Sequence, residues 1–311
     1  MPAFCQHSRK PLKPLASVHS GFQGLKQAED FAISEDGVIY YLKARSVDYG
    51  PDYFLGEYES QYGKSYIDDE PNLRRLARSR MDWMESVIVA SGHTVDWPAE
   101  GPGLLEIGSA AGFFLDEAKE RGFRTLGVEI SGFASDFARN RGHSIVQSSF
   151  ASPNLIRAIS DMLPISQLAQ ARTEGPVSES QRPAGLDLIA AFYTVEHFPD
   201  QQLAFKRMSQ LLNPGGILLL ALPSCFGPLF RCAPERWLAS HPSDHFADYS
   251  PESLALTLDR YGLKQLSCRP SSFHPERACG WLRFLPKRWY RNWASRVGFG
   301  DTMEAVAVKQ E

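Results

Sequence analysis

After about Gly101 the apolar positions change spacing repeatedly along the chain. Short apolar runs, typical of buried strands, alternate with segments in which apolar residues recur at helical intervals. The runs predict strands at residues 103–108, 124–130, 143–148, 186–193 and 215–223. The segments between them predict helices near residues 112–121, 131–141, 154–163 and 199–212. This alternation predicts an α/β fold with a mostly parallel sheet flanked by helices.

Beyond the fifth strand the pattern predicts one more helix and two more strands. Ser250 has the chemistry of an N-cap, Pro251 suits the first helical position, and Gly262 is expected to end the helix. Further strands are expected from about Leu263 and at residues 301–310. A flexible surface loop is expected where the sequence reads "TEGPVSESQRPAG", because it is rich in turn-forming residues.

The first hundred residues differ from the rest, because tyrosines crowd them and only one amphipathic helix is evident, at residues 72–90. We expect residues 1–100 to form an N-terminal tail and a cap, and residues 101–311 to form the main domain. The cap carries four closely spaced tyrosines that would wall an aromatic or sugar substrate or simply pack the cap: Tyr53, Tyr58, Tyr62 and Tyr66.

Composition excludes some partners. The formal net charge of −3 and the isoelectric point near 6.3 give no general basic field, so no nucleic-acid partner is expected. No uncharged stretch is long enough to span a bilayer and no signal peptide is evident, so membrane contact is at most peripheral. The expected location is the cytoplasm, and the sequence makes no prediction of oligomeric state.

The five cysteines are scattered without a C-x-x-C pair, which predicts neither a zinc site nor a disulfide framework. Cys5 and His7 are potential metal ligands, but two ligands without partners are more typical of a mobile tail. No metal ligand is therefore assigned.

The stretch "LLEIGSAAGFF" is a buried strand that runs through glycines into a helix. Such turns let backbone amides approach a bound nucleotide. Glu129 ends the second strand 21 residues beyond Gly108, where a carboxylate can accept hydrogen bonds from ribose hydroxyls. A nicotinamide dinucleotide motif would need glycines at 110 and 113, where Ala110 and Phe113 stand. Glu106 would repel a pyrophosphate but attract an ammonium group.

Four motifs in this order carry a family resemblance: "LLEIGSAAGFFLDEAKERGFRTLGVEIS", "LDLIAAFYTVEHFPD", "LLNPGGILLLALPS" and "HPSDHFADYSPESLALTLDRYGL". Residues 101–311 resemble the class I S-adenosylmethionine-dependent methyltransferases, most of all the small-molecule branch with a Glu-His pair after the fourth strand. The resemblance implies a Rossmann-like sheet of seven strands, mostly parallel with an antiparallel last strand and helices on both faces. It also implies S-adenosylmethionine as cofactor and methyl transfer to oxygen or nitrogen of a small-molecule, sugar or lipid-linked acceptor.

The resemblance also implies positions for the cofactor. Residues expected at its methionine end are Glu106, Gly108, Ser109, Ala110 and Gly112, and Glu129 is expected at the ribose. Residues expected to flank the adenine and the methyl group are Ser149, Phe150, Phe192, Tyr193 and Thr194.

This sequence departs from the family in two of these places. Alanine replaces the usual glycine at Ala110, which requires that the backbone there avoid positive φ. An aspartate that commonly contacts adenine is missing, and Ser149 is expected to replace it.

Methyl transfer from a sulfonium is an in-line displacement that depends mainly on positioning. If the acceptor is a hydroxyl, a base helps, and histidine suits neutral pH. His197 and His245 are the candidate catalytic residues, with an orienting hydrogen bond to the loop backbone as the alternative for His197. Glu196 is expected to anchor its loop. Arg78 and Arg80 would pair with the cofactor carboxylate or solvate a helix face.

Residues 280–300 are rich in tryptophan and basic residues and contain no acid. Pro286 predicts the start of a helix in which Trp289, Trp293 and Val297 share one side. The segment is expected to be either a crossover packed on the sheet or a mobile lid that meets an anionic or lipid-linked acceptor at a membrane surface.

Two other function classes stay open at this point. One is a catalytically inactive, cofactor-binding interaction module, and the other is a nicotinamide-dependent reductase. Phe113 and the lack of a Tyr-x-x-x-Lys pair after the fourth strand argue against the reductase.

Overall fold

The computed structural model describes residues 4–51, 58–59, 63–95, 97–162 and 185–310. The chain forms two compact units. The first unit comprises residues 1–47, 192–205 and 220–307, and the second comprises residues 48–191, 206–219 and 308–311. Most of the segment expected to be a flexible loop lies outside the described residues. The division at residue 100 stays a prediction.

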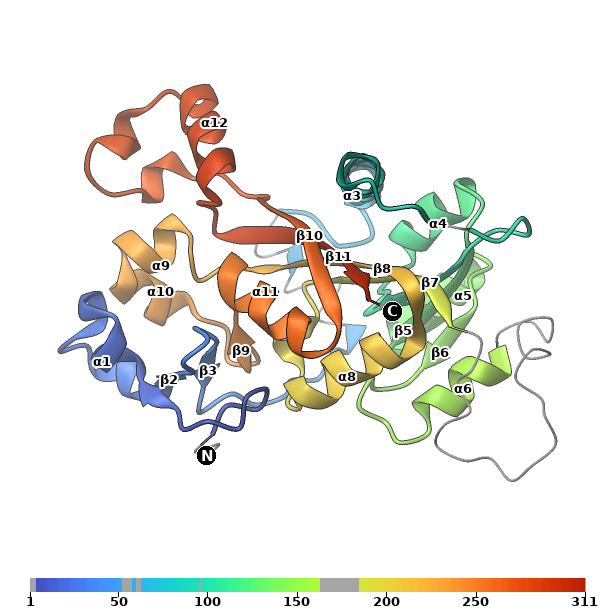
Figure 1. The fold of residues 1–311 in the computed structure, drawn as a ribbon, viewed down its shortest axis with the longest axis horizontal. Coiled ribbons are helices and arrows are strands. Elements are labelled where there is room, and N and C mark those ends of the chain that lie inside the picture. Colours follow the sequence, from blue (N-terminus) through green and yellow to red (C-terminus); the bar gives the residue numbers. More distant parts are fainter. Residues whose placement is uncertain (1–3, 52–57, 60–62, 96, 163–184, 311) are drawn as a thin grey trace. The chain divides into compact units, whose positions relative to one another are not determined.

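Seven strands form the large sheet in the order β10-β11-β8-β7-β4-β5-β6 (Figure 1). Its strands are β4 (Gly103–Ile107), β5 (Arg124–Glu129), β6 (Ile145–Gln147), β7 (Leu186–Phe192), β8 (Leu212–Pro223), β10 (Leu263–Pro270) and β11 (Thr302–Lys309). The sheet is mostly parallel with antiparallel strands at the end of the chain, which confirms the predicted Rossmann-like α/β fold. Every predicted strand is present. β8 starts three residues earlier than predicted, because Pro214 is tolerated near a strand's beginning.

The register of the central strands aligns their carboxyl ends. Ile107 of β4 pairs with Val128 of β5 on one side and with Ala191 of β7 on the other. β4 therefore lies where the strand order reverses, and ligands of open α/β sheets bind beside the carboxyl ends at such a point. The glycine turn begins at the residue that follows Ile107.

The predicted helices are also present. They are α3 (Glu70–Ser91), α4 (Phe113–Glu120), α5 (Gly132–Asn140), α6 (Leu155–Met162), α8 (Gln201–Leu211), α11 (Pro251–Arg260) and α12 (Lys287–Val297). Ser250 caps α11 by accepting a hydrogen bond from the amide of Ser253, as its position predicts. Short helices not predicted are α1 (Leu15–Val18), α9 (Pro228–Cys232) and α10 (Pro234–Ser240).

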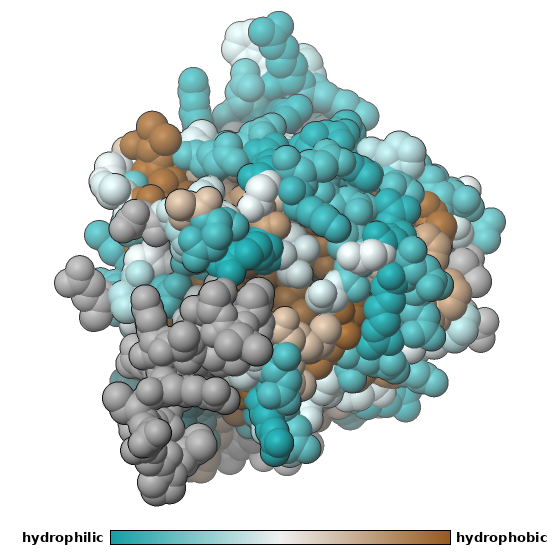
Figure 2. Space-filling view, turned by 90° about the vertical axis from the view of Figure 1, so that its right-hand side faces the viewer, coloured by the Kyte–Doolittle hydropathy of each residue, from teal (hydrophilic) through white to brown (hydrophobic). Residues whose placement is uncertain are grey.

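Helices α4 and α5 have the amphipathic character that the sequence pattern predicts. Leu115, Ala118 and Ala138 are buried, whereas Lys119 and Arg139 are exposed. The face shown in Figure 2 is accordingly mostly hydrophilic, with apolar residues gathered in smaller areas. No helix among the described residues is both long and apolar enough to cross a membrane.

The N-terminal segment is folded, which corrects the expectation of a mobile tail. In the first unit, β1 (Lys13–Pro14), β2 (Phe31–Ile33), β3 (Ile39–Tyr41) and β9 (Ala247–Asp248) form a small sheet in that order. Its strands pair antiparallel, and Tyr40 pairs with Ala247. Leu15 and Phe22 are buried, because aromatic and aliphatic side chains of α9 and α10 pack with these N-terminal residues in one apolar cluster. Cys5 is buried against the hydroxyl of Tyr40.

Two cysteines form a disulfide, so the prediction of none is wrong. Cys232 at the end of α9 is bonded to Cys279, with their Cα atoms 5.2 Å apart. The two residues are 47 positions apart in sequence, and neither lies in a pattern that announces a pair. Cys5, Cys225 and Cys268 are free thiols.

Candidate functional site

The glycine turn after β4 takes a left-handed backbone at alternate positions. Gly108 has φ 71°, Ala110 has φ 45° and Gly112 has φ 82°. The expectation that Ala110 avoids positive φ is therefore wrong. A left-handed alanine costs about 1–2 kcal/mol, and such strain persists only where neighbours hold it. Here the Ala110 amide donates a 2.8 Å hydrogen bond to Oε2 of Glu129, which holds the strained residue in place.

Glu129 links the turn to β5 from the position that the sequence predicts. Its second carboxylate oxygen accepts a 2.7 Å hydrogen bond from the amide of Ser131. Burial raises the pKa of Glu129, while the backbone amides of Ser131 and Ala110 oppose the rise. A carboxylate has about four acceptor positions, so the side chain is still able to accept a hydrogen bond from a ribose hydroxyl at the same edge of the sheet.

Gly112 starts α4 and must be glycine for two reasons. Its φ of 82° disfavours any side chain. A Cβ there would also lie 2.7 Å from Cδ2 of the His143 ring. His143 is fixed because its Nε2 donates a 2.9 Å hydrogen bond to Asp116. Burial lowers the pKa of His143 in spite of this partner, so the ring next to the turn is neutral near pH 7.

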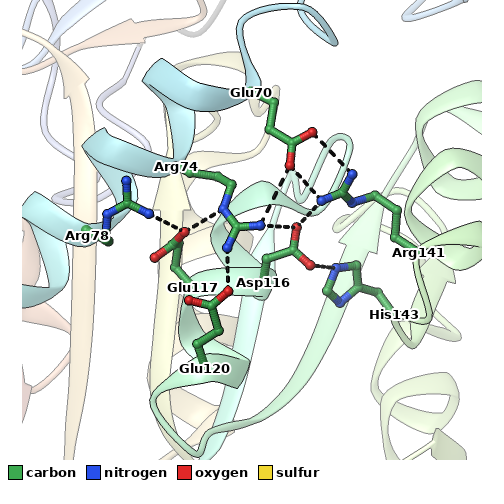
Figure 3. Close-up of polar contacts among 8 residues, drawn as sticks. All are labelled: Glu70, Arg74, Arg78, Asp116, Glu117, Glu120, Arg141 and His143. Atoms are coloured by element: carbon green, nitrogen blue, oxygen red, sulfur yellow. Dashed lines mark hydrogen bonds and ion pairs between the residues drawn. The ribbon is translucent and has the colours of Figure 1, made fainter.

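An ion-pair network braces this part of the second unit (Figure 3). Arg74 of α3 bonds to Glu117 at 2.6 Å, and Arg141 bonds to Asp116 at 2.6 Å and to Glu70 at 2.8 Å. Helices α3 and α4 are thereby held together next to the glycine turn. The sequence analysis missed this network, because its members come from three separate segments of the chain.

Glu106 is the least satisfied charge near the turn. It is 5% exposed, and its Oε2 has no hydrogen-bond partner among the described residues. Burial raises the pKa of Glu106 well above its usual range, and the charge of Arg80 only partly opposes this. A buried carboxylate without a partner is costly. An ammonium group placed here would supply the missing partner, so this position fits the amino-acid end of the predicted cofactor.

The neighbouring hydroxyl of Ser109 is also buried without a partner among the described residues. Arg78 already has a partner, because it donates a 2.8 Å hydrogen bond to Glu117.

Of the four cap tyrosines, Tyr53 and Tyr62 lie outside the described residues. Tyr66 stacks on Phe113 with ring centroids 5.8 Å apart and contacts Tyr58, so these two rings pack in the second unit.

The residues predicted at the adenine and the methyl group lie at two strand ends. Ser149 is exposed beyond β6 and its hydroxyl accepts a hydrogen bond from the Ala151 amide, while Phe150 is buried. Phe192 ends β7. Tyr193 is exposed with φ 52°, and its amide is bonded to Ala221 at 2.7 Å. The Thr194 hydroxyl donates to the carbonyl of Phe192. Contact of these residues with a cofactor stays a prediction.

In the first unit the structure places His197 and His245 next to each other, and a catalytic role for either stays a prediction. Their ring centroids are 4.8 Å apart. Nδ1 of His197 lies 3.0 Å from a carboxylate oxygen of Asp244, and Nδ1 of His245 lies 3.9 Å from one of Asp248. The expected bond of His197 to loop backbone is present too, at 3.2 Å from the Asp244 carbonyl.

Three more ionisable residues complete this group, which we call the histidine cluster (Glu196, His197, His241, His245 and Asp248). Glu196 is 1% exposed, and its Oε2 has no hydrogen-bond partner among the described residues. His241 bonds to Asp248 at 2.8 Å. Burial alone would raise the pKa of Asp248, but His241 and His245 outweigh burial and hold it well below its usual range.

A buried chain of hydrogen bonds supports the loop that carries Glu196. Tyr249 donates to Oε1 of Gln201 at 2.9 Å, and the Gln201 amide nitrogen donates to the carbonyls of Val195 and Phe198. Because the Tyr249 proton is used in this way, its oxygen accepts from Nε2 of His7 at 3.0 Å. His7 is thus part of the hydrogen-bonded support of the cluster rather than part of a mobile tail.

Residues 280–300 form a crossover between β10 and β11. A 3₁₀ helix at Gly280–Phe284 precedes α12, and Pro286 is the N-cap of α12, as predicted. Tyr290 and Ala294 are buried in a small cluster that Trp293 packs against. Trp289 and Val297 are exposed, so only Trp293 of the predicted row packs on this cluster.

Comparison with known proteins gives one family. The family model described as "Methyltransferase domain" matches residues 82–267. A 2-methyl-6-phytyl-1,4-hydroquinone methyltransferase from Synechocystis sp. is 23% identical over 242 residues, which are 74% of this chain and 62% of that protein. The chain therefore spans less than two thirds of this curated relative.

Among solved structures, a SAM-dependent methyltransferase from Archaeoglobus fulgidus is similar with a TM-score of 0.49 and 17% identity, covering 84% of this chain and all of that one. Magnesium protoporphyrin IX methyltransferase from Synechocystis PCC 6803 has a TM-score of 0.48 and 11% identity, covering 83% and 97% of the two chains.

Proposed function

The chain belongs to the methyltransferase-domain family, whose cofactor is S-adenosylmethionine, and we propose that it transfers the cofactor's methyl group to oxygen or nitrogen of a small molecule. The observation that carries this proposal is the buried Oε2 of Glu106 beside a left-handed glycine turn, because this oxygen has no hydrogen-bond partner among the described residues. S-adenosylmethionine has an ammonium group for Glu106 and ribose hydroxyls for Glu129. It has no pyrophosphate, which Glu106 would repel.

The reductase alternative is disfavoured by the same turn. Phe113 occupies the place of the third glycine of a dinucleotide motif, and its ring is buried at the start of α4. In a dinucleotide motif the glycine at this place lets the helix pack closely on the strand, which a phenylalanine obstructs. The residues of this turn therefore favour a nucleoside that carries an amino acid over a dinucleotide.

The acceptor in this proposal carries an apolar chain and resides at an anionic membrane surface. Trp281, Phe284 and Trp289 are 67%, 74% and 69% exposed. All the charged side chains of the surrounding segment are basic and exposed: Arg283, Lys287, Arg288, Arg291 and Arg296. Exposed tryptophans in a basic segment suit a membrane interface with anionic lipids. The curated relative is named for a hydroquinone that bears a phytyl chain.

Calorimetric titration of the full chain tests the cofactor. We expect S-adenosylhomocysteine to bind with micromolar affinity, which corresponds to about 8 kcal/mol, and NADH to give no binding heat. Binding of NADH without binding of S-adenosylhomocysteine would refute the proposed function. Binding of S-adenosylhomocysteine without methyl transfer to any chain-bearing phenol or amine would favour the inactive module.

Vesicle sedimentation tests the surface part of the proposal. The double variant Trp281→Ser, Trp289→Ser should lose binding to vesicles that contain phosphatidylserine, while neither protein binds phosphatidylcholine alone. Val89→Ser is the matched control, because Val89 is an 80% exposed apolar residue in the second unit. Equal sedimentation of wild type and double variant would remove the membrane from the proposal and leave methyl transfer untouched.

A further inference from the structure

We propose that Glu196, His197 and His245 bind a divalent transition-metal ion of the Zn²⁺ or Mn²⁺ type. Each of the three residues offers one ligand atom, and these atoms all lie within 4.8 Å of one another. Ligands on a tetrahedral ion with bonds near 2.1 Å are about 3.4 Å apart. Small side-chain rotations are therefore enough to bring the three atoms onto one ion.

The surroundings of both histidines match those of metal ligands. A metal-bound histidine commonly donates its other ring nitrogen to a carboxylate, which fixes the tautomer and the ring orientation. Here Nδ1 of His197 faces Asp244, and Nδ1 of His245 faces Asp248. By this rule Nε2 is the metal ligand of each ring.

Glu196 provides an independent reason to expect a cation. The residue is only 1% exposed, and its Oε2 has no hydrogen-bond partner among the described residues. Leaving such a carboxylate without a partner is costly, and a metal ion would provide one. The bonds from Gln201 to the carbonyls of Val195 and Phe198 hold the loop on both sides of Glu196, so the site is supported before any ion binds.

The donor set selects the kind of ion. Two imidazoles with one carboxylate suit Zn²⁺, Mn²⁺, Fe²⁺ or Co²⁺, whereas Mg²⁺ and Ca²⁺ prefer oxygen ligands alone. A second group of potential ligands, His241, His245 and Asp248, shares one histidine with the first. We favour the first group because Nε2 of His241 and a carboxylate oxygen of Asp248 are already bonded to each other at 2.8 Å, whereas Oε2 of Glu196 has no hydrogen-bond partner among the described residues.

The role of the ion, unlike its binding, rests on the proposed function. A three-ligand site leaves a position for the acceptor oxygen, and coordination lowers the pKa of a bound hydroxyl. The hydroxyl proton passes to solvent, and an oxygen electron pair forms the bond to the methyl carbon. The carbon–sulfur bond breaks with its electrons on sulfur, which releases S-adenosylhomocysteine. His197 and His245 then act as ligands rather than as the proton acceptor.

The test uses the full chain after treatment with EDTA, titrated with Zn²⁺ alone in a calorimeter and with Co²⁺ followed by visible absorption. We expect one ion per chain and a d–d spectrum of a site with nitrogen and oxygen ligands. Glu196→Gln and His245→Asn should each weaken Zn²⁺ binding at least 100-fold. His274→Asn, an exposed histidine of the same unit, should change nothing.

Circular dichroism shows whether each variant is folded. If His245→Asn does not fold, Glu196→Gln decides the result, because it preserves the shape of the side chain. Zn²⁺ binding that survives Glu196→Gln but is lost in His241→Asn would refute the proposed ligands in favour of the second group. Absence of stoichiometric Zn²⁺ and Co²⁺ binding to the wild type would refute the site altogether. Titration with S-adenosylhomocysteine tests the proposed function independently of the metal titrations, so either proposal can be refuted without the other.

Discussion

The glycine turn and the histidine cluster solve different problems with different parts of the chain. The turn is built from consecutive residues, and its effect comes from backbone conformation at Gly108, Ala110 and Gly112. The cluster and its hydrogen-bonded support are built from side chains of three distant segments, around His7, Glu196 and His245. Beside the turn lies Glu106 and within the cluster lies Glu196, and each has a buried carboxylate oxygen without a partner in the described part of the chain. We infer that the turn binds the cofactor and the cluster activates the acceptor.

The largest expected effect is the loss of stability in acid that His7, in the hydrogen-bonded support of the histidine cluster, should cause. Burial, helped by the positive charge of Arg260, lowers the pKa of His7 to about 4. In the unfolded chain His7 is protonated near pH 6.5. Between pH 4 and pH 6.5 the unfolded state therefore binds more protons than the folded state. The free energy of unfolding should therefore fall as pH decreases from 6.5 to 4, by up to about 3 kcal/mol at about 1.4 kcal/mol per pKa unit.

Denaturant titrations of wild type and His7→Gln across this range measure the effect. The difference between the two proteins isolates His7, since burial also lowers the pKa values of His19 and His143. Parallel curves for the two proteins would show that His7 is not buried as a neutral residue.

The second prediction removes the cluster's function without touching the turn. His245→Ala and His197→Ala should each lower kcat by about 100-fold or more, in line with the loss of a group that activates the acceptor. Rates are measured on an acceptor found by screening chain-bearing phenols and amines. Wild-type rates in both variants would mean that positioning alone drives the reaction.

The third prediction breaks the turn. Gly112→Ala places a Cβ against the His143 ring at positive φ and should lower the free energy of unfolding by about 2–3 kcal/mol. Gly122→Ala is the control, because Gly122 has φ 86° but no atom within 4 Å of the added Cβ. The clash with His143 should make Gly112→Ala the less stable of the two variants. Equal decreases in Tm in thermal unfolding would mean that the His143 ring moves aside without cost.

The smallest expected effect is a gain. Ala110→Gly relieves the left-handed alanine, and the extra freedom of glycine in the unfolded chain offsets part of the relief. A net stabilisation of about 0.5–1 kcal/mol is expected, which is a rise in Tm of about 1–4 °C. A lower Tm in this variant would argue against the φ of 45°.

The contrast between the contiguous turn and the dispersed cluster also explains which parts of the structure could be predicted from the sequence. Strands β4, β5 and β7 follow from local apolar runs, and the glycine turn follows because its residues are contiguous. The φ of Ala110 did not follow, since it depends on a bond to Glu129, 19 residues away.

Contacts at long range were beyond the sequence patterns. His7 contacts Tyr249 and Tyr261, which are 242 and 254 residues away, and Cys232 pairs with Cys279 across 47 residues. Side chains that meet over such separations leave no periodic signal. Of the histidine cluster, the sequence singled out Glu196, His197 and His245, but not as members of one group. The places of His241 and Asp248 and the hydrogen-bonded support required coordinates.

Calorimetric titration of S-adenosylhomocysteine into Glu106→Gln and His245→Ala, side by side with wild type, tests the division of labour most directly. Our account predicts that Glu106→Gln weakens binding by about 10-fold or more, because a charged hydrogen bond to the ammonium contributes about 1.5–3 kcal/mol, and that His245→Ala binds like wild type. Unchanged binding in Glu106→Gln together with weakened binding in His245→Ala would contradict it.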